Sequence, residues 1–190
     1  MDPATQLETQ SPFSNPAGGA KEAAAAYTRA LLDLLGDQDP IVVQSELPDA
    51  IDRAVRGLSD EQLRRPERPG KWSVIQVVQH LADSEIVYGY RIRMILAHDR
   101  PAIEGYDQDL WATTLRYADV PLDGALRQLR VLRETNLRLV RGLSAGDLDR
   151  FGVHSERGPE SVRRITELLA GHDLLHRRQI DRIKRAIGAG

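Results

Sequence analysis

The sequence SVIQVVQHLADSEIVYGYRIRMILAH, at residues 73–98, sets the fold class of this chain. Ser73 and Gln76 form a capping box, in which two side chains satisfy free amides at the start of a helix. Apolar residues then recur every three or four positions, which predicts a helix with one buried face. At 3.6 residues per turn the helix has roughly six turns. It ends near His98 because Pro101 cannot continue it.

Further helices are predicted from the same signals, namely apolar periodicity bounded by capping residues and by glycine or proline. The long ones are expected at residues 21–35, 40–56, 121–141 and 161–187. Pro48 should bend or interrupt the second of these. The connection at 99–120 is expected to be irregular, with a short helical piece at 108–114. No alternating strand pattern is evident, so we predict an all-α chain.

A weak internal repeat suggests how these helices pack. The sequence VRGLS at residues 55–59 recurs at residues 140–144. Each copy is followed by a short acidic turn, a loop and a helix that opens with Ser-Val, at Ser73 and at Ser161. Two similar helical hairpins predict a pseudo-two-fold four-helix bundle. In such a bundle, the inner faces of the helices at 73–98 and 161–187 can meet.

Composition bounds the remaining possibilities. The 190 residues carry a formal net charge of −2 and no cysteine, which excludes a disulfide scaffold, a zinc ribbon and a thiol nucleophile. The balanced charge argues against sequence-independent nucleic-acid binding. We predict a flexible tail at residues 1–20 and one helical-bundle domain at residues 21–190. Without a signal peptide or an 18-residue apolar run, the expected location is the cytoplasm.

Two of the five histidines, His172 and His176, are four residues apart in the last predicted helix. This spacing places both imidazoles on one face, close enough to bind one divalent metal ion. The face is apolar and therefore points inward. His80 lies among apolar residues of the helix at 73–98, and if the bundle closes as the repeat implies, it supplies a third ligand. Three neutral imidazoles with an open fourth position are typical of a catalytic metal site.

Simpler interpretations of the histidines stay open. A pair at helical spacing is often a surface accident, and a single core histidine is more often satisfied by a hydrogen bond than by a metal. His98, just before Asp99, fits a capping role at a helix C-terminus. His154 lies in a loop with Glu156, and we predict that it is structural or lies at a pocket rim.

Two aspartates lie beside the candidate ligands. Asp173 follows His172, so HDLLH imitates the HExxH motif of zinc proteases, with a side chain too short to serve well as a general base. The alternative that we favour is a solvated aspartate. Asp83 lies one turn beyond His80, where it either orients that imidazole or is a surface charge.

Other charged and aromatic residues are assigned to the surface or to packing. Trp72 and Trp111 are expected to pack, although Trp111 lies in the connection where the lip of a substrate pocket would form. Ser84 and Glu85 form a polar patch to which the sequence assigns no role. Four arginines should form the solvated face of the helix at 121–141, with a clamp for an anionic substrate as the lesser alternative. They are Arg127, Arg130, Arg138 and Arg141.

The segment PGKWSVIQVVQHLADSE at residues 69–85, together with HDLLHRRQI at 172–180, resembles the DinB-like superfamily. Within it the chain is most similar to the YfiT-type metal-dependent hydrolases and thiol S-transferases. The resemblance covers about residues 40–187 and implies a four-helix bundle with a long crossover between its second and third helices. It also implies a nickel or zinc ion held by three ligands, with His154 near but outside the ligand set. The implied ligands are His80, His172 and His176.

The leading hypothesis is therefore a divalent-metal-dependent thiol S-transferase or hydrolase. The ion would activate a bound thiol or water, and a low-molecular-weight thiol is the cosubstrate that the resemblance implies. No catalytic or cofactor-binding residue beyond the ligands is assigned. A non-catalytic metal- or ligand-binding stress-response module and a bare helical scaffold are the alternatives. We expect a small-molecule substrate, no nucleic-acid or membrane partner and, by resemblance, a homodimer.

Overall fold

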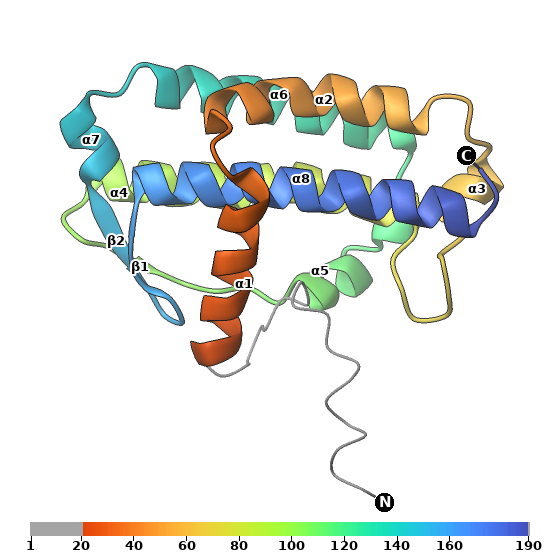
Figure 1. The fold of residues 1–190 in the computed structure, drawn as a ribbon, viewed down its shortest axis with the longest axis horizontal. Helices are drawn as coiled ribbons and strands as arrows, with labels where there is room; N and C mark the ends of the chain where they lie inside the picture. Colours follow the sequence, from red (N-terminus) through yellow and green to blue (C-terminus); the bar gives the residue numbers. More distant parts are fainter. Residues whose placement is uncertain (1–20, 190) are drawn as a thin grey trace, which may run out of the picture.

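The computed structural model describes residues 21–189, so the tail predicted for residues 1–20 lies outside the described residues. Within the described range, long helices alternate with short helices and strands (Figure 1). In chain order the elements are α1 (Lys21–Leu35), α2 (Pro40–Val55), α3 (Asp60–Arg64), α4 (Val74–Ala97), β1 (Ala102–Ile103), α5 (Gln108–Thr114), the 3-10 helix η2 (Tyr117–Asp119), α6 (Leu122–Arg141), α7 (Ala145–Asp149), β2 (Phe151–His154), β3 (Gly158–Ser161) and α8 (Val162–Ala186).

Four long helices, α2, α4, α6 and α8, form the bundle that the sequence predicts. Both α2 and α4 pack against α6 and against α8, and Figure 1 shows the four helices running side by side. The long crossover between α4 and α6 carries β1, α5 and η2. The core is apolar, and Leu47, Ile51 and Leu129 are fully buried in it. None of the helices in residues 21–189 combines the length and apolar character needed to cross a membrane.

The helix boundaries agree closely with those predicted, but Pro48 does not interrupt α2. A proline has no backbone N–H, so the helical hydrogen bond that would reach the carbonyl of Gln44 is missing. Arg133 of α6 replaces it, because its Nη1 donates to that carbonyl oxygen at 3.0 Å. The carbonyl of Gln44, which Pro48 leaves without a backbone donor, is therefore hydrogen-bonded by the neighbouring helix α6.

A small sheet corrects the prediction that the chain has no strands. The strands β2 and β3 form an antiparallel hairpin, and β1 pairs parallel to β2. They are two to four residues long, too short for a period of two to be visible in the sequence. Gly152 allows the close pairing, because a Cβ at this position would lie 2.6 Å from Ile103 Cδ1. The hairpin positions His154 at the end of β2.

The two copies of the VRGLS repeat share the cap at their serine, although Gly57 has a φ of +80° and Gly142 a φ of −86°. Ser59 is the N-cap of α3 and accepts the amide of Gln62, whose side chain accepts the Ser59 amide in return. Ser144 and Asp147 make the same reciprocal pair at the start of α7. Each copy thus ends one bundle helix and starts a short helix. The two predicted hairpins are not the main packing neighbours, because α2 and α4 each pack against α6 and α8.

The first helix, α1, crosses α8 on the outside of the bundle (Figure 1). At the crossing, the backbone of Leu31 lies against Gly171, which is followed directly by His172. A Cβ on Gly171 would overlap the carbonyl group of Leu31. Glycine is therefore needed here for close approach of two helices rather than for an unusual backbone conformation.

We expect the substitution Gly171→Ala to destabilise the protein by about 1–3 kcal/mol, because the added methyl group must displace α1. Gly124→Ala is the matched control in α6, where the new Cβ would lie 3.4 Å from Pro121 Cγ. Alanine is the better helix former, so this control should be neutral or stabilised by up to about 1 kcal/mol. Urea denaturation of both variants measures the difference. Equal stability of the two variants would show that α1 does not pack closely on α8.

Candidate metal centre

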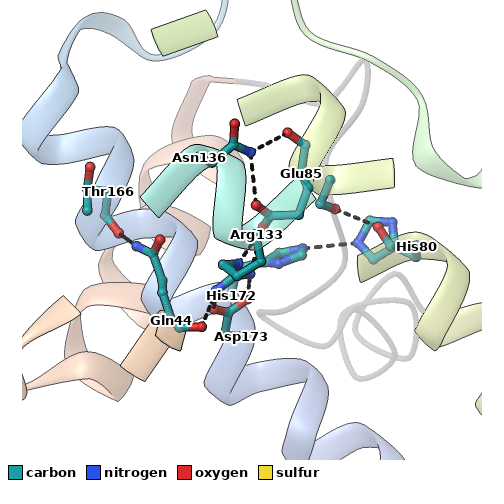
Figure 2. A network of polar contacts seen from close by, with 9 residues as sticks. Gln44, His80, Glu85, Arg133, Asn136, Thr166, His172 and Asp173 are labelled. Carbon is teal, nitrogen blue, oxygen red and sulfur yellow. Dashed lines mark hydrogen bonds and ion pairs between the residues drawn. The ribbon is translucent and has the colours of Figure 1, made fainter. Parts of the chain in front are cut away.

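Three histidines from two helices converge inside the bundle. His80 comes from α4, and His172 and His176 from consecutive turns of α8. Nε2 of His172 lies 3.0 Å from Nε2 of His80 and 3.0 Å from Nε2 of His176, and all three rings are buried. Figure 2 shows His80 and His172 pointing toward each other. Two nitrogens that bind one tetrahedral zinc ion are about 3.3 Å apart, so the spacing is close to that of shared ligands.

The Nε2 atoms of the three rings face one another around His172. The Nδ1 atom of His176 lies 2.7 Å from Oε1 of Gln179, an acceptor, so this ring carries its proton on Nδ1 and its lone pair on Nε2. The Nδ1 atom of His172 is buried and has no partner among the described residues. Nitrogen lone pairs brought this close repel one another unless a proton or a cation lies between them. The donor set therefore fits a divalent metal ion.

The three imidazoles are neutral at physiological pH. Burial lowers the pKa of His176 to about 4. Burial and the neighbouring imidazoles lower the pKa values of His80 and His172 well below their usual value of 6.5. Metal ions bind the neutral form of histidine, so these rings need not lose a proton to act as ligands at neutral pH.

A buried arginine next to the cluster links the four bundle helices. Arg133 of α6 is 1% exposed and lies between Glu85 of α4 and Asp173 of α8 (Figure 2). It forms a two-pronged ion pair with Asp173 at 2.5 and 2.9 Å, and it reaches Glu85 Oε1 at 2.6 and 2.9 Å. Its contact with the carbonyl of Gln44 adds α2. The guanidinium group thus makes four hydrogen bonds, and its Nη2 also lies at ion-pair distance from Glu85.

This network corrects the assignment of Asp173 as a solvated aspartate. The side chain is fully buried, and both its carboxylate oxygens face Arg133, so it is not placed as a general base either. Burial raises the pKa of Asp173 to about 6 although Arg133 opposes this effect. Glu85, to which no role was assigned, also accepts a hydrogen bond from Asn136 at 2.9 Å. The network holds Glu85 on α4, the helix of His80, and Asp173 on α8, the helix of His172 and His176.

Asp83 takes neither of the two roles predicted for it. It is buried, which excludes a surface charge, and its carboxylate accepts hydrogen bonds from other side chains rather than from His80. The donors are Tyr117 at 2.6 Å, Gln128 at 2.7 Å and Gln79 at 2.9 Å. Asp83 therefore fastens the crossover, through Tyr117 of η2, to α4 and α6.

The remaining predicted residues lie where the sequence placed them. His98 is exposed and caps the C-terminal end of α4. Trp72 packs its ring 4.9 Å from that of His80, and Trp111 packs against Tyr106 at 4.7 Å. The solvated face of α6 is as predicted, with exposed side chains at Arg127, Arg130, Arg138 and Arg141.

Two residues of the site were missed, and each had a signal in the sequence. Arg133 lies on the apolar stripe of α6, four residues from Leu129 and four from Leu137. A charge within such a stripe is buried and needs a partner. Gln179 follows His176 by three residues on the same helix face, which is within reach of its ring.

A small cavity of about 40 Å³ opens beside His172. Tyr27 of α1 and Tyr88 of α4 lie on its wall, with His154 and Arg157 of the β2–β3 hairpin. The last two residues also line a larger groove of about 800 Å³ between α1 and the hairpin. A ligand in this groove would therefore contact His154 and Arg157, which also line the cavity beside His172.

Comparison with known proteins agrees with this architecture and with the position of the cluster. The family model of the DinB superfamily matches residues 45–180, which run from within α2 to within α8 and include all three histidines. The chain belongs to the DinB superfamily.

Among its DinB relatives, a candidate metal-dependent hydrolase from Geobacillus thermodenitrificans is 34% identical over 149 residues, covering 75% of this chain and 81% of the relative. One from Oceanobacillus iheyensis is 32% identical, covering 69% and 76%. The solved structure of YfiT from Bacillus subtilis, described as a probable metal-dependent hydrolase with an unusual four-helix bundle topology, superimposes with a TM-score of 0.74 at 30% identity. It covers 80% of this chain and 87% of YfiT.

Proposed function

We propose that this protein is a metal-dependent hydrolase whose divalent ion is held by His80, His172 and His176. The observation that carries the proposal is the convergence of three buried, neutral imidazoles. Nε2 of His172 lies 3.0 Å from Nε2 of His80 and 3.0 Å from Nε2 of His176. The names of relatives at 30–34% identity support it. When bound, such an ion acts as a Lewis acid and lowers the pKa of a water or thiol ligand. Nickel and zinc both accept nitrogen ligands of this kind.

The surrounding residues hold and orient the ligands. Gln179 fixes the ring of His176 through its Nδ1 proton, an arrangement that sets which nitrogen faces the ion. Arg133 holds Asp173, the neighbour of His172, and so fixes that turn of α8. The cavity of about 40 Å³ beside His172 touches this one residue of the cluster.

Removal of one ligand is the direct test. We expect protein purified without a nickel column to contain about one equivalent of a divalent metal ion and to hydrolyse a chromogenic ester or amide in a chelator-sensitive way. His172→Ala should lose both the metal and the chelator-sensitive rate. His98→Ala, which replaces an exposed histidine, should keep both. Elemental analysis and initial rates measure these outcomes.

Two results would contradict the proposal. Hydrolysis that survives both chelation and His172→Ala would separate any activity from the cluster. Stoichiometric metal without turnover of any substrate would instead favour the non-catalytic metal-binding module.

A thiol S-transferase is the second candidate that we propose for the same cluster. The groove of about 800 Å³ that shares His154 and Arg157 with the cavity supports it, because it offers room for a second substrate. The chain has no cysteine, so the thiol would come from a low-molecular-weight cosubstrate. Metal-dependent conjugation of a thiol to a generic electrophile, without ester hydrolysis, would favour this candidate over the hydrolase.

A further inference from the structure

The cavity beside His172 is rich in hydrogen-bond donors. Its volume of about 40 Å³ exceeds the roughly 10–15 Å³ that one water needs and fits a group the size of a carboxylate. Burial raises the pKa of Tyr88 to about 12, and it raises the pKa of Tyr27 above its usual value. Both hydroxyl groups therefore stay protonated at neutral pH and can donate.

His154 contributes a donor that the protein leaves without an acceptor. Its side chain is 1% exposed, and its Nδ1 accepts the backbone amide of Glu156 at 3.1 Å. Burial lowers the pKa of His154 to about 4, so the ring is neutral and its proton is on Nε2. That Nε2 is buried and has no partner among the described residues. A buried donor of this kind is costly unless a ligand or water supplies the acceptor.

The positive charge at the cavity comes from Arg91. Arg91 is 6% exposed, its Nη2 donates to a neutral acceptor, the carbonyl of Glu104, at 2.7 Å, and burial lowers its pKa. This lowering shows that nearby groups do not fully compensate the buried charge. Arg157, in contrast, is paired with Glu160 at 2.5 Å. The Glu156 carboxylate also lines the cavity, on the side of Gly105.

We propose that this cavity binds a carboxylate group of the substrate, with Arg91 supplying the charge and Nε2 of His154 and the hydroxyls of Tyr27 and Tyr88 supplying hydrogen bonds. A carboxylate offers only acceptors, which matches these donors, whereas the Glu156 carboxylate on the side of Gly105 opposes a bound anion. The bound group lies next to His172, so the substrate class is a carboxylic acid whose reacting bond reaches the histidine cluster. As a statement about substrate, this inference rests on the proposed function.

Binding of acetate to the full chain tests the cavity without turnover. We expect the Nε2–H signal of His154, assigned by its loss in His154→Gln, to shift in a saturable manner in nitrogen-15 spectra. Acetamide, the neutral analogue of similar size, should give no saturable shift. Chelator-treated protein should bind acetate as well, because the contacts come from the chain itself. Failure of hydrolysis would therefore leave this result unaffected.

Matched variants locate the binding. Arg91→Met and Tyr27→Phe should each weaken acetate binding by about tenfold or more, as expected for loss of a hydrogen bond to a charged group. Tyr90→Phe is the control, since Tyr90 is on the same helix as Arg91 and is 61% exposed. Equal affinities of Tyr27→Phe and Tyr90→Phe would overturn the proposal. Saturation only in metal-loaded protein would also overturn it, because acetate would then be bound by the ion.

Discussion

Replacing Arg133 by methionine is expected to destabilise the protein by about 3–5 kcal/mol, because it leaves two carboxylates buried without a counter-charge. Glu85 and Asp173 have no exposed surface through which water could solvate them. The carbonyl of Gln44 would also lose its donor at the gap that Pro48 creates in α2. Since the network joins all four bundle helices, the loss should appear as a lower midpoint of a single urea transition.

Arg130→Met is the matched control for this effect. Arg130 lies three residues earlier on α6 and pairs with Asp49, but both side chains are largely exposed, at 45% and 62%. An exposed pair contributes about 0–1 kcal/mol, so this variant should unfold near the wild-type midpoint. Adding Glu85→Gln and Asp173→Asn to Arg133→Met should recover part of the loss. If Arg133→Met and Arg130→Met were equally stable, the buried network would not hold the bundle together.

The elements that could be predicted from sequence are those whose signal is local. The capping box at Ser73 and the apolar period of α4 define that helix without reference to the rest of the chain. The repeated VRGLS segment also supports a long-range prediction, because the equivalence of α4 and α8 implies that His80 can meet His172. By contrast, β1 depends on pairing with a segment about 50 residues away, Ile103 with His154, and no local pattern encodes that. The β2–β3 hairpin is local, but its strands are too short to show a period of two.

The difference between local and long-range signals also explains which features of the site could be predicted from the sequence. The ligand spacing of His172 and His176 lies within one helix, whereas the partner of Asp173 is 40 residues away on another. From the sequence alone, Asp173 next to His172 is interpreted as solvated or catalytic, because the sequence does not show that Arg133 lies opposite it. Asp83 shows the same limit, because Tyr117 and Gln128 reach it from outside α4. The apolar stripe of α6 indicates that the charge of Arg133 is buried, but it does not indicate which residues pair with that charge.

Acidification should unfold the metal-free protein through its buried histidines. The pKa values of His154 and His176 are lowered to about 4, and those of His80 and His172 well below 6.5. Below about pH 6.5 the unfolded chain therefore binds protons that the folded chain does not. Each such histidine costs about 1.4 kcal/mol of stability per pH unit between about pH 6.5 and its folded pKa. The stability is fully present above pH 6.5 and is lost as the pH falls.

Four histidines acting together contribute up to about 5–6 kcal/mol per pH unit near pH 5, and the raised pKa of Asp173 opposes this by about 1.4 kcal/mol per pH unit. The net slope of about 4 kcal/mol per pH unit approaches the whole stability of a marginal domain. Calorimetry in chelator, with two buffers of different ionisation enthalpy, should show net uptake of about three protons on unfolding at pH 5.5, because the histidines take up nearly four and Asp173, whose folded pKa is about 6, releases most of one. His154→Leu should reduce the uptake by about one, and the exposed His98→Asn should change it little. Uptake below one proton would mean that these rings are already charged in the folded state. A charged cluster could not present lone pairs to a metal, so this measurement also tests the electrostatic basis of the proposed site.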